Sequence, residues 1–105
     1  MHDVPEIDIH AAKAALDAQS ATFVDIRDPQ SHATGHIPGC RHITSQEDVD
    51  ALGEELKSDA PVIVYCYHGN SSKGATLFLK QKGFKNVQSM AGGFEAWRAA
   101  YPVQQ

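Results

Sequence analysis

The sequence has few cysteines, no long apolar run and no excess of positive charge. Two cysteines among 105 residues leave little scope for disulfides as the main source of stability. No apolar stretch approaches the ~20 residues of a membrane-spanning helix, and a net charge of −4 argues against nucleic-acid binding. The start, MHDVPEIDIH, lacks the basic and apolar regions of a signal peptide. We therefore expect one domain over residues 1–105, cytoplasmic, with free thiols and no nucleic-acid or membrane partner.

Short β-prone stretches alternate along the chain with segments of helical character. Such alternation predicts βαβ units, and hence an α/β fold with a mainly parallel sheet covered by helices on both faces. The strand patterns cover 21–26, 40–44, 61–66 and 84–90, and the helical patterns cover 9–19, 30–34, 46–56, 72–82 and 94–101.

The most apolar strand, VIVY (62–65), ends at Cys66, and a loop of small and polar residues follows it. In parallel sheets, binding sites form beyond the carboxyl ends of the strands. Gly69 and Asn70 tolerate positive φ, so successive N–H groups can turn toward one point, and a helix beginning near Ser72 adds its positive end. The same field lowers the pKa of a cysteine. The pattern predicts an anion cradle around a nucleophilic thiolate; the competing interpretation is a buried cysteine that only packs.

The spacing around Cys66 argues against several other cysteine chemistries. A tyrosine-phosphatase-type site has the pattern C-x5-R, but Ser72 stands at the arginine position, and Lys73 cannot form a bidentate fork. No C-x-x-C pair is present, which excludes a thioredoxin-like site. A small cysteine phosphatase or arsenate reductase is therefore the less favoured reading. What remains is an acceptor for a group smaller than phosphoryl, such as a single sulfur atom held as a persulfide. The protein would then be either an enzyme or a non-catalytic module that carries or senses the persulfide.

Three separated motifs resemble those of the single-domain rhodanese family, namely VDIRDPQSHATGHIPG (24–39), CYHGNSSKG (66–74) and AGGFEAW (91–97). The resemblance implies a rhodanese-like fold with about five mainly parallel strands. It also implies thiosulfate:cyanide sulfurtransferase activity through a persulfide on Cys66, with sulfite released and no metal or organic cofactor. Cyanide, or in the cell a small dithiol such as thioredoxin, would accept the sulfur.

We expect the residues that follow Cys66 to hold thiosulfate and the persulfide, mainly through their N–H groups. Asp25 and Arg27 end a neighbouring strand, where they either support the active loop from behind or form a structural ion pair. The predicted binding residues are Tyr67, His68, Gly69, Asn70, Ser71, Ser72 and Lys73.

Histidines and a second cysteine lie outside this loop. His32 and His36 are four residues apart with His42 nearby, a pattern that could suggest a metal site, but Gly35 interrupts any helix between them, so we expect no metal. By the resemblance, His32 replaces a usual Phe or Tyr and Cys40 replaces a usual alanine. We expect Cys40 to be a buried structural residue rather than a resolving thiol.

Overall fold

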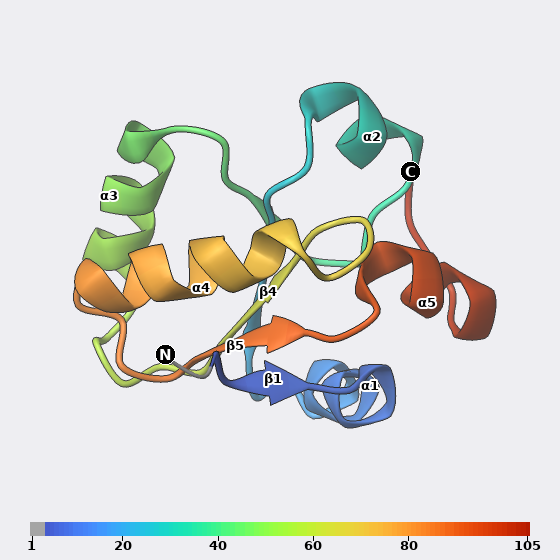
Figure 1. Ribbon diagram of the computed structural model, residues 1–105, viewed down its shortest axis with the longest axis horizontal. Helices are drawn as coiled ribbons and strands as arrows, with labels where there is room; N and C mark the ends of the chain where they lie inside the picture. Colours follow the sequence, from blue (N-terminus) through green and yellow to red (C-terminus); the bar gives the residue numbers. More distant parts are fainter. Residues whose placement is uncertain (1–3) are drawn as a thin grey trace.

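The computed structural model describes residues 4–105, which form a five-stranded sheet with helices packed on it (Figure 1). The strand order is β1-β5-β4-β2-β3, and every pairing is parallel. None of the helices in this part of the chain has the length and apolarity needed to cross a membrane. The elements are β1 (Glu6–Ile7), α1 (Ile9–Asp17), β2 (Thr22–Asp25), α2 (Pro29–Thr34), β3 (Arg41–His42), α3 (Gln46–Glu55), β4 (Val62–Tyr65), α4 (Ser71–Gln81), β5 (Val87–Met90) and α5 (Gly93–Ala100).

The predicted α/β architecture is confirmed, and β1 is the strand that no sequence pattern indicated. It has only two residues, Glu6 and Ile7, which pair with Ser89 and Met90 at the edge of the sheet. Two residues are too few to show the period of two that identifies a half-buried strand. The pairing with β5 is a tertiary contact, so only the folded chain defines this strand.

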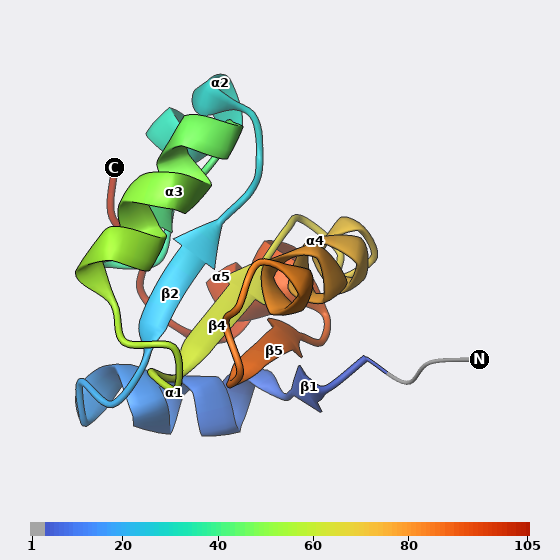
Figure 2. The ribbon, with the colours of Figure 1, turned by 90° about the vertical axis from the view of Figure 1, so that its left-hand side faces the viewer.

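Side chains that alternate along the strands divide the core into two layers. Phe23 and Ile63 pack with Trp97 on the face covered by α1 and α5. Their neighbours Val24 and Val64 pack on the opposite face, which α3 and α4 cover. Figure 2 shows α3 in front of β2 and α5 behind the strands. Both faces are buried, as expected for parallel strands with continuous apolar sequences.

Local capping signals fix the starts of two helices. The Asp8 carboxylate accepts the N–H of Ala11 at 2.8 Å and begins α1. Ser45 and Asp48 form the predicted capping box at the start of α3. The start of α4 differs, because its N-cap residue, Asn70, makes no side-chain capping hydrogen bond. The first N–H groups of α4 therefore need other acceptors.

Candidate active site

The loop between β4 and α4 lies at the carboxyl edge of the sheet, between α2 and α5 (Figure 1). The start of α5 anchors it: the Phe94 N–H donates to the Cys66 carbonyl at 2.8 Å, and the Glu95 N–H donates to the Tyr67 carbonyl at 2.9 Å. Gly93 makes this approach possible, because a Cβ there would lie 2.5 Å from the Tyr67 oxygen and its φ is +62°. The glycines of the AGG motif thus let α5 pack directly on the loop.

The sulfur of Cys66 lies where backbone N–H groups converge. It accepts the N–H of Gly69 at 3.1 Å and that of Ser72 at 3.2 Å. Gly69 is in the left-handed region, with φ +92°, which turns its N–H inward. Because α4 has no side-chain N-cap, the sulfur accepts an N–H that an Asp or Ser side chain would otherwise take.

These contacts stabilise the charged form of the thiol. Burial of Cys66 opposes ionisation, but hydrogen bonds from the Ser72 hydroxyl and from the backbone of Ser72, Gly69 and His68 outweigh it, and the pKa of Cys66 lies below its ordinary value. The N-terminal end of α4 acts in the same direction. The site therefore provides a thiolate nucleophile and donors that can hold a second anionic sulfur.

Two buried hydroxyl groups extend this network behind the sulfur. Cys66 Sγ lies 3.4 Å from Ser72 Oγ, whose hydroxyl donates to the sulfur in its thiolate form, and Ser72 Oγ lies 2.7 Å from Ser89 Oγ. Both serines are fully buried. Ser89, on β5, was not predicted as a site residue, and its sequence context, VQSM, indicates only a strand. Contact between β5 and the start of α4 is what brings it to the site.

The predicted loop residues have different positions. Gly69 and Ser72 are buried against the sulfur. Tyr67 is half-buried, with its ring 6.4 Å from that of Phe94. The four residues with exposed side chains are His68, Asn70, Ser71 and Lys73.

Asp25 and Arg27 form a buried ion pair at the end of β2. The Arg27 guanidinium donates to both Asp25 oxygens, at 3.0 and 2.7 Å, and to the Gly35 carbonyl at 2.6 Å. His32 and the Tyr65 hydroxyl also donate to Asp25. Burial opposes the charge of Asp25, but the hydrogen bonds from Arg27 and His32 outweigh it and lower its pKa. These contacts join β2 to the end of α2. They are therefore explained by the second alternative stated above, that Asp25 and Arg27 form a structural ion pair.

The three histidines stack on one another. His32 lies between His36 and His42, with ring centroids 4.1 and 4.3 Å away. Potential ligand atoms of Asp25, His32 and Cys40 do lie within 4.8 Å of one another. However, both oxygens of Asp25 already accept from its ion-pair partner, so this cluster fits a hydrogen-bonded structural unit better than a metal site.

Cys40 is half-buried rather than fully buried, so the expected degree of burial was wrong. Its sulfur lies 3.3 Å from the Tyr65 hydroxyl oxygen. Burial raises the pKa of Cys40, the opposite of the effect at Cys66. The structure therefore makes the two thiols chemically different.

Comparisons with known proteins agree with the motifs. The sequence model of the rhodanese-like domain family matches residues 8–100 of this chain. "Thiosulfate sulfurtransferase GlpE" of Pseudomonas paraeruginosa is 52% identical over 84% of this chain and 79% of that protein. The protein of the same name from Vibrio cholerae is 46% identical over 93% of this chain and 92% of its own. The crystal structure of the Alr3790 protein from Anabaena sp. superimposes with a TM-score of 0.84 at 28% identity, over 93% of this chain and 81% of that chain.

Proposed function

Since this chain belongs to the rhodanese-like domain family, we propose that its Cys66 carries the sulfur in a thiosulfate sulfurtransferase reaction. The chain is a thiosulfate sulfurtransferase, the activity named for relatives 52% and 46% identical over most of its length. One observation supports the role of Cys66 above all others. Its sulfur lies where the N–H groups of Gly69 and Ser72 converge, and its pKa is lowered.

The reaction has two half-reactions with a covalent intermediate between them. The Cys66 thiolate attacks the outer sulfur of thiosulfate, the sulfur–sulfur bond of thiosulfate breaks, and sulfite leaves with the bonding electrons. The persulfide that forms is anionic, and the inward N–H groups of the loop hold its terminal sulfur. An acceptor nucleophile then attacks that terminal sulfur, and Cys66 leaves as the thiolate.

The acceptors in this proposal are cyanide in the assay and a small dithiol such as thioredoxin in the cell. The scheme needs no metal or organic cofactor, because the cysteine side chain itself carries the sulfur. The proposed compartment is the cytoplasm, a reducing environment that suits the two free thiols, Cys40 and Cys66.

The direct test is the intact mass of the protein after brief exposure to thiosulfate. We expect wild type and Cys40→Ala to gain one sulfur atom, which cyanide then removes, and Cys66→Ala to gain none. Cys40→Ala is the matched control, because it removes a thiol whose pKa is raised.

A failure to gain sulfur in folded wild-type protein would contradict the proposal. If a different persulfide donor loaded Cys66 while thiosulfate did not, the protein would instead be a non-catalytic module that carries or senses a persulfide. Hydrolysis of an aryl phosphate that depends on Cys66 would instead favour the phosphatase.

A further inference from the structure

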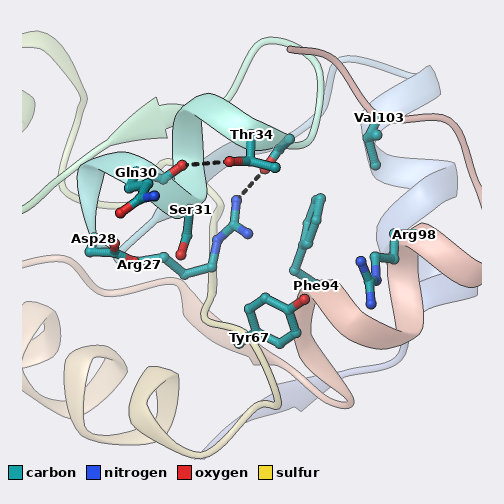
Figure 3. Close-up of a pocket in the computed structure, with 10 residues that line it drawn as sticks. Arg27, Asp28, Gln30, Ser31, Thr34, Tyr67, Phe94, Arg98 and Val103 are labelled. Carbon is teal, nitrogen blue, oxygen red and sulfur yellow. Dashed lines mark hydrogen bonds between the residues drawn. The ribbon is translucent and has the colours of Figure 1, made fainter.

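A cavity of ≈ 320 Å³ lies beside the active loop, between α2 and α5 (Figure 3). Tyr67, which directly follows Cys66 in the chain, forms part of its wall. The few heavy atoms of thiosulfate, at about 30 Å³ each, fill only part of this space. The volume lies in the range of sites for larger small molecules, ~300–1,000 Å³. The cavity therefore has room for a second substrate with an organic part.

Arg27 presents unused hydrogen-bond donors to this cavity. Its side chain is 5% exposed, and its Nε and Nη2 donate to Asp25 and to the Gly35 carbonyl. Among residues 4–105, Nη1 has no hydrogen-bond partner. Figure 3 shows the guanidinium group beside Phe94, whose ring centroid lies 4.0 Å from the guanidinium carbon. No buried side-chain nitrogen or oxygen in the described part of the chain lacks a partner, so Nη1 is open to the cavity rather than buried. A charged donor that faces a cavity favours a ligand with an anionic oxygen.

The remaining walls restrict the chemistry of such a ligand. Arg98 on α5 adds a second guanidinium group from the opposite side, and Asp28 lies on the α2 side. The aromatic rings of Tyr67 and Phe94, with the side chain of Val103, offer apolar contacts. An anionic group between the two arginines and a short hydrocarbon segment against the rings would match these walls. The Asp28 carboxylate would repel a second anion at its own end.

On these grounds we propose that the cavity binds the carboxylate end of a small thiol that accepts sulfur, a mercaptocarboxylate, and this inference rests on the function proposed above. The bound thiolate attacks the terminal sulfur of the Cys66 persulfide. The bond between that sulfur and Cys66 breaks, Cys66 leaves as the thiolate, and the acceptor leaves as its own persulfide. Arg27 and Arg98 hold the carboxylate and so favour anionic acceptors over neutral ones of similar size.

The test compares two acceptor thiols with protein already loaded by thiosulfate and freed of excess donor. The probes are 3-mercaptopropionate and 2-mercaptoethanol, and each second-order rate constant is divided by the fraction of the thiol present as thiolate. The ratio of the two constants measures preference for the carboxylate. We expect Arg98→Gln to lower this ratio about threefold to fivefold, the effect of one partly exposed ion pair.

Arg41→Gln is the matched control. The Arg41 side chain is 42% exposed and paired with Glu55, whereas that of Arg98 is 50% exposed and paired with Glu95. Arg41 lies outside this cavity, so its substitution keeps the ratio unchanged. Val103→Asp, at a partly exposed wall position, is a second variant that lowers the ratio by adding a negative charge.

A ratio that neither Arg98→Gln nor Val103→Asp changes would overturn the inference. A ratio that falls equally in Arg41→Gln would overturn it as well, because the effect would then follow net charge alone. These results differ from a failure of the proposed function, in which thiosulfate does not load Cys66 and no transfer step can be measured.

Discussion

The Ser72 hydroxyl offers a quantitative test of how the fold lowers the pKa of Cys66. Ser72→Ala removes this hydroxyl but keeps the backbone N–H that the sulfur accepts at 3.2 Å. The Gly69 N–H, at 3.1 Å, also remains. The substitution therefore isolates one donor of the cradle and leaves the path of the loop in place.

The expected magnitude follows from the strength of one hydrogen bond to a charged group. Such bonds contribute about 1.5–3 kcal/mol, and the 3.4 Å separation of Cys66 Sγ from Ser72 Oγ places this one at the weak end. One pKa unit corresponds to about 1.36 kcal/mol. We therefore expect the pKa of Cys66 to rise by about 1 unit in Ser72→Ala.

The assay is the rate of alkylation by iodoacetamide as a function of pH, in a Cys40→Ala background so that only Cys66 reacts. The thiolate is the reactive form. At a pH below the pKa of Cys66 in both proteins, the thiolate fraction falls tenfold for each unit by which that pKa rises. The variant should thus react about tenfold more slowly at acidic pH and at nearly the same rate where both proteins are fully ionised.

Two controls separate this effect from damage to the fold. Ser71→Ala changes the neighbouring exposed serine and should leave the alkylation profile unchanged. Ser72→Ala also leaves the buried Ser89 hydroxyl without the partner that lies 2.7 Å from it. The double variant Ser72→Ala/Ser89→Ala removes this unpaired hydroxyl as well. An unchanged profile in both folded Ser72 variants would refute the reasoning, since the backbone alone would then set the pKa.

Two further predictions concern the packing of the loop and the buried ion pair. Gly93→Ala should lower kcat/KM for thiosulfate at least tenfold, because its Cβ would lie 2.5 Å from the Tyr67 carbonyl and displace the active loop; near-normal turnover would contradict this. Asp25→Asn should lower the free energy of unfolding by about 3–5 kcal/mol in urea titrations, because Arg27 loses its buried counterion. The pKa of Asp25 is lowered in the folded state, so its contribution is fully present above its unfolded pKa of ~4 and is lost as pH falls through the lower folded value. The wild type should therefore lose more stability than Asp25→Asn as pH is lowered below ~4, and parallel losses would refute this.

The elements of this fold that were predictable are those with local causes. The capping box of Ser45 and Asp48 lies within one turn, and the apolar run before Cys66 identifies a buried strand. The cysteine loop could be recognised because a strand end, a glycine and a helix start follow one another in the sequence. Such signals need no knowledge of distant residues.

The parts that escaped prediction depend on contacts between distant segments. Ser89 reaches the sulfur network only because β5 pairs with β4, and β1 exists only as a partner of β5. Arg27 keeps one donor group free because its other donors are taken by Asp25 and by the Gly35 carbonyl, which only the fold brings to it. A sequence shows the type of each side chain, but hydrogen-bond saturation is a property of the folded state.

The use of a cysteine sulfur as a cap for α4 has a consequence for the stability of the protein. The atom that accepts the Ser72 N–H is the same atom that changes its covalent state during turnover. By thermodynamic linkage, any state of Cys66 that accepts this N–H more strongly also stabilises the first turn of α4. The empty and sulfur-loaded enzymes should therefore differ in the local unfolding of that turn, and so in the protection of its amides from hydrogen exchange.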